Sequence, residues 1–261
     1  MSGNAGRSRG RRPGADSWEP VAFWYDGWVG ERGSRYHQAS AIPVVLDLLR
    51  PGRGEEILDL GAGQGVLAPY VAARGGRYTG IDASPSLVEI ARRRHGRHGR
   101  FLVGDTRALH AIPELARQGH DAAVFMLSIQ DMDPLEPIFA SLDWALRNTS
   151  RVVLFMTHPA FRQPRHAGWG FDPARKLTYR RVDAYLGEMA VPMKSLGDVR
   201  TVSFHRPISA YVNGLASIGF AVDAMIEIPD LPTGQRPRGR RAATLADEEI
   251  PLFLGIRARR P

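Results

Sequence analysis

The chain has 261 residues, of which 43% are hydrophobic, and this suits one domain with its own core. It contains no cysteine, which excludes disulfides, thiolate metal sites and covalent catalysis by cysteine. No window of about 18 uninterrupted apolar residues occurs, and the apolar segment 21–29 is broken by Asp26 and Gly27. We therefore expect a cytoplasmic protein without a membrane span or a twin-arginine export signal.

The net charge of +8 comes almost entirely from arginine, because Lys176 and Lys194 are the only lysines. Arginines cluster at the start of the chain, in residues 7–12, and again in residues 236–241. An arginine-rich surface can hold RNA through its phosphates, so an RNA-binding function stays open as an alternative. The local clustering favours solvated tails instead.

Residues 1–16 are rich in Gly, Ser and Arg and have no large apolar side chain, so we predict a disordered tail without catalytic groups. The composition changes abruptly at Trp18, and five aromatic residues follow within residues 18–28. This density indicates a lid. We expect Phe23 and Trp24 to bury the segment against a sheet.

Residues 41–49 have apolar side chains at the spacing of an amphipathic helix, and Pro51-Gly52 ends it. A short apolar run, residues 57–60, then contains the acid Asp59. Three glycines follow at alternate positions: Gly61, Gly63 and Gly65. Such a loop turns sharply and leaves room for a ligand.

The glycine loop opens a βαβ unit. Residues 66–73 predict a helix and residues 78–81 a second strand, which ends at Asp82. Asp82 follows Asp59 at about the 20-residue interval at which such units offer a carboxylate to a ribose. A dinucleotide fingerprint would read G-x-G-x-x-G, but here the third glycine comes one residue early.

The loop D-L-G-A-G-Q-G instead resembles motif I of the class I S-adenosylmethionine (SAM) methyltransferases, and the resemblance extends over residues 55–158. It implies SAM as the cofactor and no metal. The residues that it implies for cofactor binding are Asp59, Gly61, Gly63, Gly65, Asp82, Ala83, Asp105, Thr106, Leu127 and Tyr36. In many small-molecule members an N-terminal helical segment folds over the cofactor, which points to Tyr25, Arg35, Tyr36 and His37.

Further elements alternate as the resemblance requires. Ser84 is expected to cap a helix that starts at Pro85 and ends in the basic run 92–95. Strands are predicted over residues 101–103 and 122–129, a helix over 134–146 and a fifth strand over 151–156. The unbroken apolar run 122–129 is typical of a parallel strand that is covered on both faces.

The segment after the fourth strand reads L-S-I-Q-D-M-D-P. Methyltransferases of nucleic-acid amino groups have an Asn/Asp-Pro-Pro-aromatic sequence there, so this departure argues against base-amine methylation. The resemblance places residues 127–131 beside the reactive methyl group, with Ser128 and Gln130 as substrate-binding residues.

Residues 157–198 leave the regular alternation and contain many aromatic, Pro and Arg residues, so we predict a substrate cap. Its candidates are His158, Phe161, Arg162, Trp169, Phe171, Tyr179, Arg180 and Tyr185. A helix over 205–220 and strands over 221–228 and 252–256 complete the chain, and the resemblance implies that the last strand is antiparallel.

We therefore predict an α/β, Rossmann-like, doubly wound sheet of seven strands, with a lid at 17–50, a cofactor-binding core at 51–158, a cap at 159–200 and the rest of the core at 201–261. The resemblance implies a bacterial natural-product methyltransferase with a small aromatic acceptor, for example the indole C3 of a tryptophan-derived cyclic dipeptide. Candidate catalytic residues are His158, Tyr25 and Tyr179, and candidate substrate-binding residues in the cap are Phe161, Arg162, Trp169 and Arg180. A non-catalytic SAM-binding protein stays open, as does the choice between monomer and homodimer.

Overall fold

The computed structural model describes residues 18–163, 165–193, 201–230 and 245–260. Both arginine clusters, residues 7–12 and 236–241, and the predicted tail 1–16 lie outside these ranges. None of the helices in the described ranges is long and apolar enough to cross a membrane.

The secondary structure follows the predicted alternation. The helices are α1 (Ala22–Val29), α2 (Ile42–Leu49), α3 (Ala68–Ala72), α4 (Pro85–His95), α5 (Leu135–Ala145), α6 (Ile208–Ser217) and α7 (Leu245–Glu249). Short helical turns are η1 (Glu19–Val21), η2 (His37–Ala41), η3 (Gly96–His98), η4 (Thr106–Ala111) and η5 (Ile129–Asp131). The strands are β1 (Glu56–Leu60), β2 (Arg77–Asp82), β3 (Gly99–Val103), β4 (His120–Met126), β5 (Leu146–Thr157), β6 (Ala167–Asp172), β7 (Leu177–Val182), β8 (Met189–Pro192), β9 (Val202–His205), β10 (Ala221–Pro229) and β11 (Pro251–Arg259).

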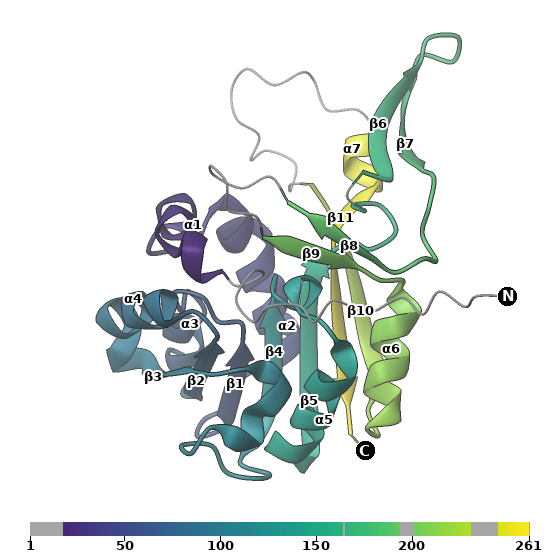
Figure 1. Cartoon of the computed structure of the whole chain (residues 1–261). Coiled ribbons are helices and arrows are strands. Elements are labelled where there is room, and N and C mark those ends of the chain that lie inside the picture. Colours follow the sequence, from purple (N-terminus) through teal and green to yellow (C-terminus); the bar gives the residue numbers. More distant parts are fainter. Residues whose placement is uncertain (1–17, 164, 194–200, 231–244, 261) are drawn as a thin grey trace, which may run out of the picture.

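Seven strands form one sheet in the order β10-β11-β5-β4-β1-β2-β3 (Figure 1). β1 pairs in parallel with β2 and β4, and β11 pairs antiparallel with both β5 and β10. The predicted seven-stranded sheet with an antiparallel last strand is confirmed. Parallel strands bind ligands at their carboxyl ends, where the order of strands reverses, and this reversal lies between β1 and β4.

Both faces of the sheet are covered. Along β4, Ala122 and Val124 belong to an apolar cluster with α2, α3 and α4, whereas Ala123 and Phe125 belong to a second cluster with α5 and α6. Alternate side chains of one strand point to opposite faces, so each strand supplies both clusters. The predicted double covering is confirmed.

The N-terminal segment lies against α4 as a lid, drawn in purple in Figure 1. Glu19 accepts hydrogen bonds from the hydroxyls of Ser84 and Ser86, and Asp26 forms an ion pair with Arg94. Polar contacts therefore fasten the lid to α4, beside the buried apolar residues Val21, Ala22 and Val29. The expected burial of Phe23 and Trp24 is wrong, because 76% and 41% of these residues are exposed.

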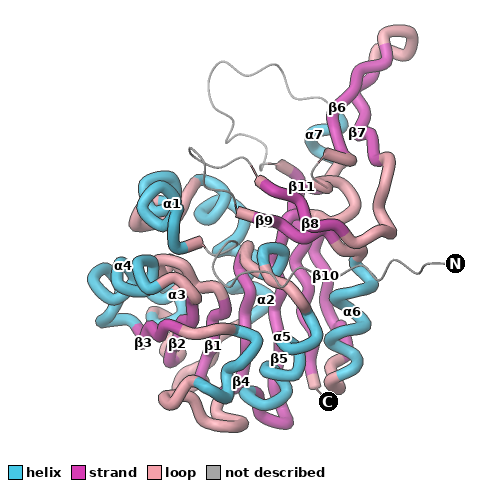
Figure 2. The backbone as a smooth tube through the Cα atoms, in the orientation of Figure 1, coloured by secondary structure: helices cyan, strands magenta, loops and turns pink. Residues whose placement is uncertain are grey.

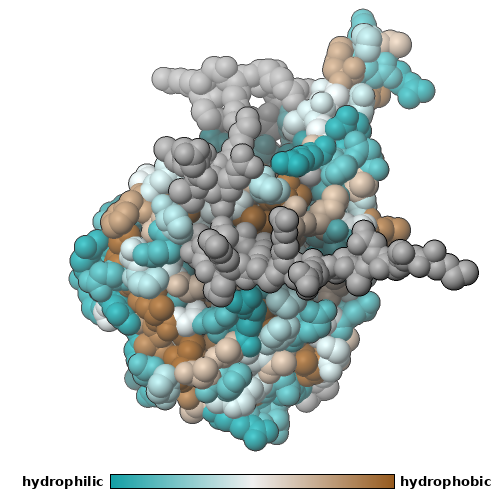
Figure 3. Space-filling view, in the orientation of Figure 1, coloured by the Kyte–Doolittle hydropathy of each residue, from teal (hydrophilic) through white to brown (hydrophobic). Residues whose placement is uncertain are grey.

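The cap consists of two small antiparallel sheets, β6–β7 and β8–β9 (Figure 2). The β6–β7 hairpin projects from the body, and in the space-filling view its side chains are a mixture of hydrophobic and hydrophilic (Figure 3). β9 pairs with β8, so the cap continues past its predicted end at residue 200, and α6 begins only at Ile208. The pairing of β8 with β9 across residues 193–201 produces these boundaries, and local composition does not reveal it.

The fourth strand also ends earlier than predicted, at Met126. Leu127 has a left-handed backbone with φ 59, and residues 129–131 form the turn η5. The apolar run continues to Ile129 because that side chain is buried in the core although it has left the sheet. The helix predicted over 134–146 is present as α5, over Leu135–Ala145. The predicted Ser84 cap is confirmed, because Ser84 Oγ accepts from Leu87 N at 3.2 Å.

Candidate active site

The glycine loop follows β1 and is folded onto β2. Gly61 N and Ala62 N both donate to Ile81 O, at 2.8 and 3.0 Å. Gly61, Gly63 and Gly65 have φ of 72, 54 and 79, values that side-chain-bearing residues rarely adopt. A Cβ on Gly65 would lie 2.4 Å from the Phe101 ring. These positions thus require glycine for both conformation and space.

Asp82, at the end of β2, holds the glycine loop through a hydrogen bond from the loop's backbone. Its Oδ2 accepts from Gly63 N at 2.8 Å and its Oδ1 accepts from Ser84 N at 2.9 Å. Burial raises the pKa of Asp82, while the backbone hydrogen bonds from Ser84 and Gly63 lower it. Each carboxylate oxygen accepts one bond in the structure, so lone pairs remain for further donors such as the two hydroxyls of a ribose.

Asp59, on β1, is 2% exposed and has one satisfied oxygen. Its Oδ2 accepts from the Tyr78 hydroxyl at 2.6 Å, whereas its Oδ1 is buried without a hydrogen-bond partner. Burial raises the pKa of Asp59 to about 7, against the lowering effect of the Tyr78 hydrogen bond. An orphaned buried acceptor beside the glycine loop fits a ligand that carries hydrogen-bond donors.

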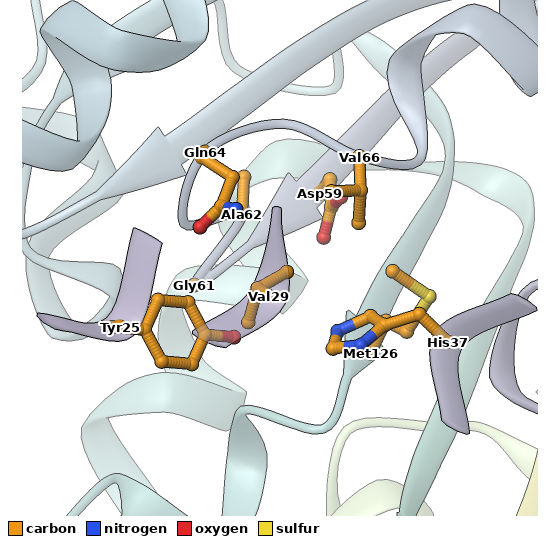
Figure 4. Close-up of a pocket in the computed structure, with 9 residues that line it drawn as sticks. All are labelled: Tyr25, Val29, His37, Asp59, Gly61, Ala62, Gln64, Val66 and Met126. Atoms are coloured by element: carbon orange, nitrogen blue, oxygen red, sulfur yellow. The ribbon is translucent and has the colours of Figure 1, made fainter. Parts of the chain in front are cut away.

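The lid closes a pocket over this loop, and its empty space measures about 280 Å³ including the mouth (Figure 4). Residues from the lid, the loop and β4 line it: Tyr25, Val29, His37, Asp59, Gly61, Ala62, Gln64, Val66 and Met126. This figure includes open solvent, and only a small part of the space is enclosed. With the lid in this position, the pocket accommodates only part of a nucleoside cofactor.

Tyr25 and His37 enter this pocket from opposite sides of the lid (Figure 4). Burial raises the pKa of Tyr25, and the carboxylates Asp82, Asp131 and Asp59 raise it further, so the phenol stays protonated. Burial lowers the pKa of His37 to about 4, so its imidazole is neutral at pH 7. The His37 Nδ1 lies 2.9 Å from the Ser34 hydroxyl.

The turn after β4 forms the neighbouring wall. Leu127 N donates to Phe155 O at 2.7 Å, and the Gln130 side chain donates to Leu127 O at 2.7 Å. These bonds hold Leu127 in its left-handed backbone, a strain typical of functional sites. Ser128 Oγ donates to Leu60 O at 2.6 Å and is buried, so this hydroxyl supports the end of β1. Burial raises the pKa of Asp131 to about 7, while a hydrogen bond with Ser203 lowers it.

The remaining predicted cofactor residues lie along the ends of β2 and β3. Ala83 is exposed next to Asp82, and Gly104 N donates to Asp82 O at 3.0 Å. Asp105 forms an ion pair with Arg107 at 2.7 Å, which occupies part of its carboxylate. Thr106 is buried, with its hydroxyl 3.5 Å from the Met132 sulfur.

His158 lies just past β5 and is 2% exposed. Its Nε2 is 2.8 Å from Glu227 Oε1, and its Nδ1 accepts from Ala160 N at 3.2 Å. Burial lowers the pKa of His158, and Glu227 raises it. With both ring nitrogens engaged, His158 holds the loop after β5 in the structure, and its catalytic role stays a prediction.

The other predicted residues lie in the lid and in the cap. Tyr36 donates to Asp230 at 3.3 Å and packs edge-on against Phe253, above β10 and β11. Trp169 and Tyr179 lie on the β6–β7 hairpin, with 37% and 44% of their surfaces exposed. Neither residue lines the pocket beside the glycine loop. Phe161 packs against the His158 ring, and its carbonyl accepts from Arg180 Nε at 2.7 Å.

Pocket-lining residues that were not predicted from the sequence include Gln64, Met126 and Val29. Gln64 lies inside the glycine loop, and its side chain donates to Gly30 O of the lid at 2.8 Å. Its Oε1 is buried without a partner. A large polar residue between two glycines is a signal that could have been noticed. Met126 and Val29 carried no such signal, because they read as ordinary core residues.

Comparisons with known proteins agree with this geometry. Residues 57–149 match the family described as "Methyltransferase domain". A crystal structure of a SAM-dependent methyltransferase from Mesorhizobium loti has a TM-score of 0.68 and 26% identity, and the match covers 84% of this chain and 96% of that one. With the observed strand order, these findings show a methyltransferase domain over residues 57–149 and the fold of the class I SAM-dependent methyltransferases.

Similar proteins whose names state an acceptor differ in that acceptor. A demethylmenaquinone methyltransferase of Tropheryma whipplei is 30% identical over 107 residues, which is 41% of this chain and 44% of that enzyme. Less than half of that relative is therefore matched. A 1,6-didemethyltoxoflavin-N1-methyltransferase of Burkholderia thailandensis, solved with bound 1,6-didemethyltoxoflavin and S-adenosylhomocysteine, has 16% identity and a TM-score of 0.55, with 92% of this chain and 84% of that chain covered. This likeness concerns the fold alone.

Proposed function

We propose that the protein transfers a methyl group from SAM to a small aromatic acceptor. The observation that carries this proposal is the combination of Asp82 and the glycine loop: a buried carboxylate, held by two backbone N–H groups, that keeps lone pairs for a ribose. When bound, SAM supplies a methyl group on a positively charged sulfur.

In this proposal Asp82 holds the ribose hydroxyls, the glycine loop lies along the methionine part, and Ala83, Asp105 and Thr106 flank the adenine. The unpartnered Asp59 Oδ1 can accept a hydrogen bond from the cofactor. Tyr25 covers the loop, since a Cβ on Gly63 would lie 3.5 Å from its ring. The lid thereby excludes water and orients the reacting groups.

The proton released by the acceptor needs a group with a free lone pair. Tyr25 is protonated, so its role is donation or positioning. Asp131 is the better acceptor in the turn after β4, because a pKa of about 7 matches the working pH. The catalytic roles predicted for His158 and Tyr179 can be tested by measuring kcat of variants that lack each side chain.

The acceptor is proposed to bind between the lid and the cap. Aromatic side chains from both segments, among them Tyr36, Phe161 and Trp169, support an aromatic compound. An indole-containing natural product, with methylation at C3, is one form of this proposal, and a bacterial, cytoplasmic setting belongs to it.

An RNA acceptor is less well supported by the described surface. Many arginines there form ion pairs with acids of the same chain, including Arg94, Arg151 and Arg257 with Asp26, Glu55 and Asp223. Such pairs reduce the positive charge that phosphates would meet. A non-catalytic SAM-binding protein is the other alternative, and only turnover distinguishes it.

The test is a transfer assay with radiolabelled SAM and a panel of aromatic metabolites, followed by mass spectrometry of the product. We expect one methyl group on a small aromatic acceptor, with a rate that changes little between 50 and 300 mM salt. Methylation of RNA that falls steeply with salt would favour the RNA alternative. Calorimetric binding of S-adenosylhomocysteine without any turnover would favour the non-catalytic one.

A further inference from the structure

Arg162 is half-buried, and two nitrogens of its guanidinium have no hydrogen-bond partner. It follows β5 in the turn that His158 begins, where its backbone N donates to His158 O at 2.8 Å. Its Nε and Nη2 are shielded from water and have no hydrogen-bond partner. Burial also lowers the pKa of Arg162. A shielded, unsatisfied guanidinium is costly, so this one calls for an explanation.

The two unsatisfied nitrogens form one edge of the guanidinium. Nε–H and the adjacent Nη2–H point in the same direction and match the two oxygens of a carboxylate. An anion with two oxygens can satisfy both donors at once, as carboxylates do with arginine. The geometry of the unmet donors therefore favours such an anion.

A second arginine stands beside the first. Arg180, on β7, donates from Nε to Phe161 O at 2.7 Å, and burial lowers its pKa, with a further lowering by the charge of Arg162. The guanidinium carbons of Arg162 and Arg180 lie 5.5 and 5.1 Å from the centre of the Trp169 ring. Trp169 thus positions both cations, and the pair concentrates positive charge where β6–β7 meets the loop after β5.

The nearest acids do not neutralise this pair by contact. Asp230 raises the pKa of both arginines and Asp247 that of Arg162, but within the described ranges neither arginine forms a salt bridge. Asp230 accepts instead from the Tyr36 hydroxyl. Tyr36 is the chain neighbour of His37, which lines the pocket beside the glycine loop. Residues 36–37 of the lid therefore connect the pocket with Asp230, the acid that acts on both arginines.

We propose that Arg162 and Arg180, supported by Trp169, form a subsite for a carboxylate of the acceptor, and that the acceptor is an aromatic acid. The inference rests on the proposed function, because it places the acceptor between the pocket and the cap. It disfavours a neutral cyclic dipeptide, which would leave the Arg162 edge unsatisfied.

The test measures binding without turnover. Three aromatic acids, indole-3-acetate, benzoate and cinnamate, are each compared with their amides by ligand-observed NMR titration in the presence of S-adenosylhomocysteine at pH 7.5 and 150 mM salt. We expect at least one acid to bind at least ten times more tightly than its amide. Arg162→Gln should reduce this ratio below two without changing the affinity for S-adenosylhomocysteine.

Matched variants separate geometry from charge. Arg162→Lys keeps the charge but loses the two-nitrogen edge, so it should lose most of the preference. Arg181→Gln is the control, because Arg181 is the exposed neighbour of Arg180 and pairs with Asp183 at 3.3 Å. It should keep the full preference. If Arg162→Gln lowers the melting temperature strongly, Arg180→Gln serves as the second variant, with a reduced preference expected.

Several results would overturn the proposal. These are no acid binding more tightly than its amide, a preference that survives in both Arg162→Gln and Arg162→Lys, or phenyl phosphate binding ten times more tightly than benzoate. The last result would assign the pair to a phosphoryl group. Binding of acids without any methyl transfer would refute the proposed function but support the carboxylate subsite. Equal methylation of acids and amides would support the proposed function but refute the subsite.

Discussion

Replacement of Asp59 by Asn should change how stability depends on pH. Asp59 is buried on β1, with one oxygen bonded to Tyr78 and the other without a partner. Burial raises its pKa to about 7 in the folded protein, from about 4 for an aspartate in water. The folded state therefore binds a proton more tightly than the unfolded chain in the window between these two values. The stabilisation is fully present below pH 4 and is lost as pH rises through 7.

The magnitude follows from the shift of about three pKa units, at roughly 1.4 kcal/mol for each unit. Integrated between pH 4.5 and pH 8, Asp59 should lower the free energy of unfolding by about 3 kcal/mol. Asp59→Asn cannot ionise, and its amide oxygen can still accept from Tyr78. Between pH 4.5 and pH 8, the free energy of unfolding of Asp59→Asn should therefore fall by about 3 kcal/mol less than that of the wild type.

The assay is urea unfolding without cofactor at pH 4.5, 5.5, 6.5 and 8, for the wild type and Asp59→Asn. Taking the difference between the two proteins removes the contributions of other groups, such as His37, whose lowered pKa acts in the opposite direction. Asp47→Asn, on the exposed face of α2, is the control and should follow the wild-type profile. Wild-type and Asp59→Asn profiles that stay parallel within about 1 kcal/mol would refute the reasoning.

Four further predictions concern the site. Asp82→Ala should weaken S-adenosylhomocysteine binding by about 1.5 to 3 kcal/mol, the value of hydrogen bonds to a charged group, and unchanged affinity in calorimetry would remove Asp82 from the ribose site. His158→Ala should lower the melting temperature and keep kcat within about tenfold, because its ring nitrogens are engaged with Glu227 and Ala160; a loss of about 10²- to 10⁴-fold in a stably folded protein would instead identify it as the base. Glu19→Gln should raise KM for SAM about two- to tenfold, because it weakens the contacts of the lid with Ser84 and Ser86; an unchanged KM would show that the lid does not depend on them. A chain that begins at Asp16 should keep the melting temperature and kcat, and loss of activity with intact cofactor binding would place the tail in the acceptor site or in a partner contact.

Local sequence was sufficient to predict the glycine loop, the position of Asp82 and the cap of α4. Motif I, Asp82 and the Ser84 cap lie in one βαβ segment and its following turn, so their geometry depends on residues close in the chain. The cap was predicted as a region but without its two small sheets. β8 and β9 pair through their backbones, and neither strand has a sequence pattern that identifies the other as its partner. The exposure of Phe23 and Trp24 was missed because aromatic density does not say which face of a helix meets the core.

The sequence by itself determined the seven-stranded architecture and the position of the glycine loop, because apolar periodicity, glycines and caps act over a few residues. Only the tertiary structure decided which polar atoms are left without partners. The orphaned Asp59 Oδ1, the left-handed Leu127 and the unsatisfied edge of Arg162 arise from elements that lie far apart in the chain. Burial and hydrogen-bond satisfaction depend on all neighbours of an atom at once, and these neighbours are known only when the chain is folded.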